Sequence, residues 1–124
     1  MPRQRLIKDR CAQVLEWMKD VRPCGREVKL SFVTCNSKEE KDLYGYVTRS
    51  GRSLRISINT KKCNRMDVTI DTLIHEYAHC RMWGLAKSEC SGKIDDHGPE
   101  FWAEYGVIYN LFHYEDGYLE SNSY

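Results

Sequence analysis

His75-Glu76-Tyr77-Ala78-His79 is the stretch of sequence that decides both the expected fold and the expected chemistry. Residues four apart lie one above the other on the same face of an α-helix, so His75 and His79 can point at a single metal ion. Glu76 lies one position further round the helix, within reach of a water molecule that such a metal would activate. The segment therefore predicts a helix that carries two metal ligands and one catalytic carboxylate.

The residues on either side of this segment have the pattern of a helix. Apolar side chains recur at helical spacing between positions 70 and 78. Asp67 or Thr69 can cap the start of the helix, and Asp71 adds negative charge to its first turn. Gly84 is placed to end it just after Trp83. We therefore expect the two histidines in the middle of one helix.

The residues before this helix predict another helix and three strands. Apolar positions at three- and four-residue steps over residues 6–18 predict an amphipathic helix that ends near Pro23. Alternating apolar residues over 28–33 predict a strand. Residues 43–48 and 54–59, joined by Arg49-Ser50-Gly51-Arg52, predict a β-hairpin.

A further helix is expected after the motif. A polar loop over residues 87–96 leads to Gly98-Pro99, and Pro99 suits the first turn of a helix that runs to about Phe112. The expected fold class is therefore α+β: an N-terminal helix, a small three-stranded sheet with a hairpin, the motif helix and a following helix. The length of 124 residues predicts one domain over 1–124, with a frayed tail at 115–124.

Composition favours a soluble protein that is not secreted. Apolar residues make up 41% of the chain and charged residues 30%, and no apolar run approaches the roughly 20 residues of a membrane span. The first ten residues lack the apolar stretch of a secretory signal. We expect a cytoplasmic protein, or one associated with the nucleoid or nucleus, with no membrane partner.

The six cysteines do not indicate a zinc ribbon or a disulfide framework. They occur without a C-x-x-C pair and without the clustering of small secreted scaffolds. We therefore expect reduced thiols, and a zinc ion held by histidine.

Charge is divided between the two halves of the chain. Residues 1–65 carry 16 Lys and Arg against 7 Asp and Glu, whereas residues 66–124 carry 3 against 11, so the halves have net charges of +9 and −8. A basic half can attract the phosphates of a nucleic acid, although a solvated face would look the same in the sequence.

A third metal ligand must come from beyond the motif helix. Catalytic zinc sites normally have three protein ligands, with the fourth position open. His97 precedes the last helix after a loop long enough to reverse the chain, so it is the favoured third ligand. Glu100 and Glu104 on that helix are competing candidates. His113 is an unlikely ligand, because it lies at the far end of the helix.

The motif followed by His97-Gly98-Pro99-Glu100-Phe101-Trp102 resembles the SprT-like metalloprotease domain, the family that includes Spartan-type proteases of DNA–protein crosslinks. The resemblance covers most of the chain and corresponds to a minimal, stand-alone form without the family's further DNA-binding or zinc-ribbon segments. It implies a zincin-like fold, a Zn²⁺ cofactor held by His75, His79 and His97, and proteolysis.

The function expected from these observations is that of a zinc-dependent endopeptidase. Glu76 would act as general base on a metal-activated water, and the substrate would be a protein or peptide, including proteins associated with DNA. The strand 54–59 is a candidate to bind substrate backbone if it lies at the sheet edge, and Asp71 is a candidate to orient a ligand imidazole. The oxyanion could be stabilised by any of Tyr105, Tyr109, Tyr114, His113 and Arg81. The alternative is a zinc-binding, non-proteolytic interaction module of a nucleoprotein complex.

Overall fold

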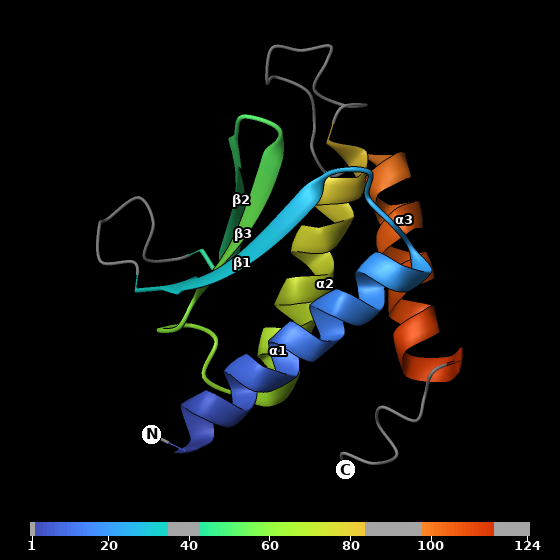
Figure 1. Ribbon diagram of the computed structural model, residues 1–124. Coiled ribbons are helices and arrows are strands. Elements are labelled where there is room, and N and C mark those ends of the chain that lie inside the picture. Colours follow the sequence, from blue (N-terminus) through green and yellow to red (C-terminus); the bar gives the residue numbers. More distant parts are fainter. Residues whose placement is uncertain (1, 35–42, 84–97, 116–124) are drawn as a thin grey trace.

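Three helices and a three-stranded sheet make up the part of the chain that the structure describes. The structure is a computed structural model, and it describes residues 2–34, 43–83 and 98–115. The elements are α1 (Pro2–Val21), β1 (Glu27–Val33), β2 (Gly45–Ser50), β3 (Ser53–Asn59), α2 (Met66–Met82), α3 (Pro99–Asn110) and the π-helical turn η2 (Leu111–Glu115) (Figure 1). The predicted α+β class is confirmed, with an N-terminal helix, a mixed sheet and then two helices.

The sheet has the strand order β1-β3-β2, so β3 is its central strand. β1 runs parallel to β3, and β2 runs antiparallel to it. The predicted hairpin is confirmed: Ser50 pairs with Ser53, and Gly51 takes a φ of 63° in the two-residue turn, a conformation that glycine adopts without strain. Residues 54–59 were a candidate to bind substrate only if they lay at the sheet edge, and that condition is not met, because β3 pairs with β1 on one side and with β2 on the other.

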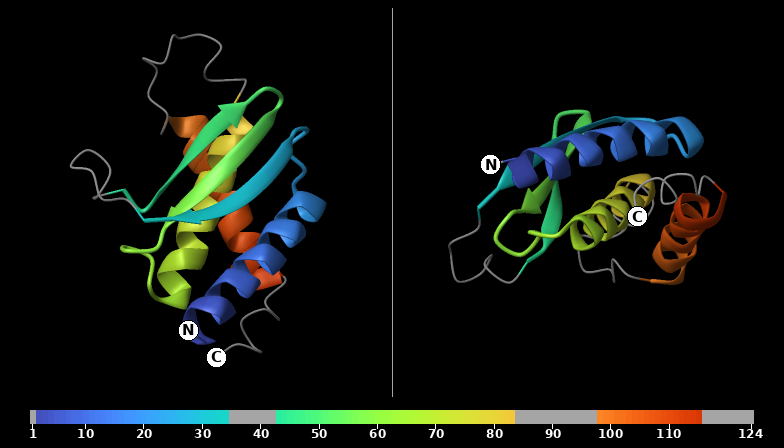
Figure 2. Two further views of the ribbon diagram at one scale, coloured as in Figure 1. Left: turned by 60° about the vertical axis from the view of Figure 1, so that its left-hand side comes forward. Right: turned by 90° about the horizontal axis from the view of Figure 1, so that it is seen from below.

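The core forms between one face of the sheet and the helices. Leu54, Ile56 and Ile58 alternate along β3, and each is fully buried. α2 contacts β2 and β3, and it also contacts α1 and α3. The views in Figure 2 place α3 on the side of α2 that is turned away from the sheet. α2, which carries the motif, is therefore the central helix of the described fold.

The start of α2 differs from the prediction. Arg65 is the N-cap residue, and its side chain makes no capping hydrogen bond. The Thr69 hydroxyl instead donates to the Arg65 carbonyl at 2.6 Å, and Asp67 accepts a hydrogen bond from the Arg65 guanidinium at 2.7 Å. Asp71 lies beyond the first turn. The predicted caps Asp67 and Thr69 are therefore wrong by two and four positions, because the helix begins at Met66 and both side chains bond to Arg65 from inside the helix.

α3 begins as predicted, with Gly98 at the N-cap and Pro99 in the first turn. It ends at Asn110 and continues into η2, so helical structure reaches slightly beyond the expected end near Phe112. The predicted loop over 87–96, His97, and the tail from residue 116 onward lie outside the described residues. Within the described ranges, no helix has the combination of length and apolar character that a bilayer span requires.

Candidate active site

His75 and His79 lie side by side on α2. Their ring centroids are 5.0 Å apart with an interplanar angle of 74°, and both side chains are partly exposed. The structure thus brings together two of the three expected ligands. Over residues 2–34, 43–83 and 98–115, no group of three His, Cys, Asp or Glu side chains is arranged to hold a metal ion. The expected third ligand, His97, falls outside these ranges.

Aromatic side chains of α3 form a wall against the two imidazoles. The Phe101 ring stacks on His79 at 4.3 Å between centroids and meets His75 edge-on at 4.9 Å. Tyr105 and Trp102 lie 5.7 and 6.3 Å from the His75 ring, again edge-on. These contacts restrict how the imidazoles can turn, so α3 helps to fix the orientation of both candidate ligands.

Glu76 is buried beside the histidines, with only 7% of its surface exposed. Its carboxyl makes no hydrogen bond or ion pair with any residue in the described part of the chain, and burial raises its pKa to about 7. A buried carboxyl without a partner lowers stability, so folded proteins retain such groups mainly at functional sites. Its pKa is suited to proton transfer near neutral pH.

Gly45, the first residue of β2, lies directly against Glu76. A Cβ atom at this position would be 2.9 Å from the Ser57 carbonyl oxygen, 3.0 Å from Thr72 Cγ2 and 3.4 Å from Glu76 Cγ. Only glycine therefore allows β2 to approach α2 so closely. Gly45 falls inside a predicted strand, and a glycine within a strand pattern is the sequence signal that could have suggested this close approach.

Glu104 is held by two arginines. Arg22 donates two hydrogen bonds to its carboxylate at 2.7 and 3.1 Å, and Arg81 Nε donates a third at 2.7 Å. Burial alone would raise the pKa of Glu104, but these hydrogen bonds hold the pKa below its ordinary value. Glu104 was a competing candidate for the third ligand, and the structure instead commits it to this Arg22–Glu104–Arg81 cluster. Glu100, the other competitor, is exposed in the first turn of α3.

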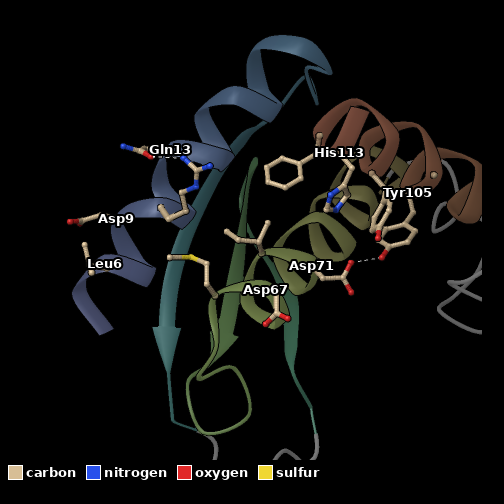
Figure 3. A pocket seen from close by; sticks show the side chains of 13 residues that line it. Leu6, Asp9, Gln13, Asp67, Asp71, Tyr105 and His113 are labelled. Atoms are coloured by element: carbon tan, nitrogen blue, oxygen red, sulfur yellow. Dashed lines mark hydrogen bonds between the residues drawn. The ribbon is translucent and has the colours of Figure 1, made fainter. Parts of the chain in front are cut away.

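Asp71 makes a contact that differs from its expected role. It accepts a hydrogen bond from the Tyr105 hydroxyl, with 2.5 Å between the oxygens, across the gap between α2 and α3 (Figure 3). Burial, and then the bond to Asp71, raise the pKa of Tyr105. Asp71 therefore binds the phenol that packs against His75, and none of the imidazoles in residues 43–83 and 98–115 donates a hydrogen bond to its carboxylate.

Comparison with known proteins adds no assignment, because the sequence matches no protein-family model and no curated protein. The chemistry of the site is therefore argued from its own residues.

Proposed function

We propose that the protein is a zinc-dependent endopeptidase of the SprT-like type, with a zincin-like fold and Glu76 as general base. The observation that carries this proposal is the buried Glu76 carboxyl, which has no hydrogen-bond or ion-pair partner among the described residues and lies next to two adjacent imidazoles on one face of α2. A purely structural pair of histidines has no need of such a carboxyl, because a structural zinc site closes all four of its positions with protein ligands.

The donor set fits zinc. Imidazole nitrogen is a preferred ligand of this ion, and we assign His75, His79 and His97 as its three protein ligands. Zn²⁺, when bound, would supply Lewis acidity toward the scissile carbonyl. Glu76 would take a proton from the attacking water and deliver it to the leaving amine, which a carboxyl with a pKa of about 7 can do in both directions. Phe101 and Tyr105 would keep the ligand imidazoles in place.

The substrate backbone is proposed to pair with the outer edge of β2. This strand bonds to β3 on one side only within the described sheet, and its first residue lies against Glu76. An extended peptide added along this edge would pass beside the general base, and main-chain pairing would give low sequence specificity. β2 therefore replaces residues 54–59 as the candidate substrate-binding strand.

Contact with nucleic acid is proposed for the face of the sheet that points away from α2. Lys29 on β1 is paired in register with Arg55 on β3, and both side chains are exposed, as is Arg52 in the hairpin turn. Phosphate groups could bind there without blocking the histidines. Such contact would direct the enzyme to DNA-associated proteins. It would equally suit the second candidate function, a zinc-binding module of a nucleoprotein complex without proteolytic activity.

A casein-cleavage assay, run with and without DNA, distinguishes the proposed endopeptidase from a zinc-binding module that has no proteolytic activity. The zinc-loaded wild type should cleave casein, a zinc chelator should stop cleavage, and Glu76→Gln should retain zinc but lose turnover. Glu16→Gln is the matched control, because it removes an exposed carboxylate from α1, which carries none of the candidate ligands. Persistent cleavage by Glu76→Gln would refute the mechanism. Salt-sensitive DNA binding by a wild type that never cleaves would favour the module.

Metal analysis tests the ligand set separately. One zinc ion per chain is expected for the wild type, and His97→Ala should bind zinc far more weakly. Unchanged zinc affinity in His97→Ala would exclude His97. If Glu100→Gln lost zinc instead, the third ligand would be Glu100.

A further inference from the structure

Tyr105 brings a phenol group to the side of the candidate metal ligands. Its ring centroid lies 5.7 Å from that of His75, and its hydroxyl donates to Asp71 Oδ1 at 2.5 Å. Asp71 precedes His75 by one turn of α2, a separation of about 6 Å along the helix axis. The hydroxyl is therefore held about one helical turn away from the position of His75.

The other described donors that could stabilise an oxyanion are less suitably placed. Arg81 donates to Glu104 and to the Pro23 carbonyl oxygen, so its guanidinium is committed to the Arg22–Glu104–Arg81 cluster. Tyr109 lies one turn further along α3, and its ring packs against His113 at 4.2 Å. Among these donors in the described part of the chain, Tyr105 is the one whose ring contacts a candidate ligand.

Within the described residues, the Tyr105 hydroxyl is held by a single hydrogen bond, the one to Asp71. Tyr105 and Asp71 both line a cavity of about 980 Å³ between α1, the first turns of α2, the second half of α3 and η2 (Figure 3). Asp71 is exposed and makes no ion pair with any described residue, so water can replace the phenol as its hydrogen-bond donor. The Tyr105 hydroxyl can thus exchange Asp71 for another acceptor, with water taking its place at Asp71.

We propose that Tyr105 is a catalytic residue whose hydroxyl leaves Asp71 and donates a hydrogen bond to the scissile carbonyl oxygen as that oxygen gains negative charge. Asp71 is a positioning residue that holds the hydroxyl at the edge of the site until substrate arrives. The phenol keeps its proton throughout, so no bond is made or broken at Tyr105. This inference rests on the proposed endopeptidase function and specifies one further residue of that site.

Tyr105→Phe and Tyr109→Phe form the decisive pair of variants. Each variant removes one hydroxyl group and keeps the aromatic ring. The two positions lie one helical turn apart on α3. With a fluorogenic peptide that the wild type cleaves, Tyr105→Phe should lower kcat by about 100-fold, the usual effect of losing one oxyanion donor, with KM little changed. Tyr109→Phe should cleave at close to the wild-type rate. Equal rates for the two variants would overturn the proposal.

A phosphinic peptide inhibitor separates catalysis from structure, because its tetrahedral oxygen mimics the oxyanion. Its Ki should rise in Tyr105→Phe by about the same factor as kcat/KM falls. Zinc content should stay at the wild-type level, and a loss of zinc would instead assign Tyr105 a structural role. Asp71→Asn should keep most of its activity; a loss as large as that of Tyr105→Phe would show that the pair acts only as a clamp. If the wild type cleaves nothing, the proposed function fails first and this inference fails with it.

Discussion

Replacing Glu76 with glutamine is expected to stabilise the metal-free protein at alkaline pH. Burial raises the pKa of this carboxyl from its ordinary value of 4.5 to about 7, so the folded chain holds the proton more tightly than the unfolded chain does. The stability that depends on this proton is complete below pH 4.5, is lost as the pH rises toward 7, and stays lost above it. Since one pKa unit corresponds to about 1.4 kcal/mol, the full loss is about 3 kcal/mol.

Urea unfolding with a chelator present measures this effect. The free energy of unfolding of Glu76→Gln, minus that of the wild type, should increase by about 2 kcal/mol between pH 5 and pH 8, because glutamine does not ionise. Glu100→Gln serves as the control, since its exposed side chain is solvated in both the folded and the unfolded chain. A difference between Glu76→Gln and the wild type that is the same at both pH values would show that burial of Glu76 does not have the proposed electrostatic effect.

Three further predictions concern other parts of the fold. Gly45→Ala should lower the free energy of unfolding by about 1–3 kcal/mol, because its Cβ would lie 2.9 Å from the Ser57 carbonyl oxygen; urea unfolding that matches the wild type would contradict this. Glu104→Gln should lower the free energy of unfolding by about 2–3 kcal/mol at pH 7, because the guanidinium groups of Arg22 and Arg81 lose the negative charge that they share. The lowered pKa of Glu104 means that the wild type loses this stabilisation as the pH falls through that pKa, so thermal melts of variant and wild type should converge in acid. Burial raises the pKa of the Cys11 thiol to about 12, so a thiol reagent at pH 8 should modify Cys11 only after urea unfolds the chain; rapid labelling of the folded protein would refute its burial.

Local patterns in the sequence were sufficient to predict the elements and the placement of three candidate site residues on one helix. Helical and strand periodicities predicted the three helices and three strands, because apolar residues recur at the period of each kind of element. The positions of His75, Glu76 and His79 on one helix follow from the helical repeat alone. Gly51 in the hairpin and Pro99 at the start of α3 act through their own backbone restrictions, which do not depend on the rest of the fold.

Contacts between distant segments could not be predicted in this way. The position of β3 at the centre of the sheet depends on its parallel pairing with β1, and nothing local to residues 53–59 specifies that partner. Glu104 was considered as a metal ligand because a carboxylate on α3 is chemically suitable. Its actual partners, Arg22 and Arg81, lie 82 and 23 residues earlier in the chain. The ion pair between Arg22 and Glu104 thus joins the basic half of the sequence to the acidic half.

The contact between Arg22 and Glu104 also has a consequence for biosynthesis. Arg22 must wait for 82 more residues before its partner is made, which takes about 4–16 s at ordinary rates of translation. During that interval α2 lacks the stacking surface of Phe101 and Tyr105, and the arginines lack their shared anion. In an endopeptidase of the proposed kind, the candidate catalytic centre could not form until α3 had been synthesised. The nascent chain would therefore not cleave itself before that point.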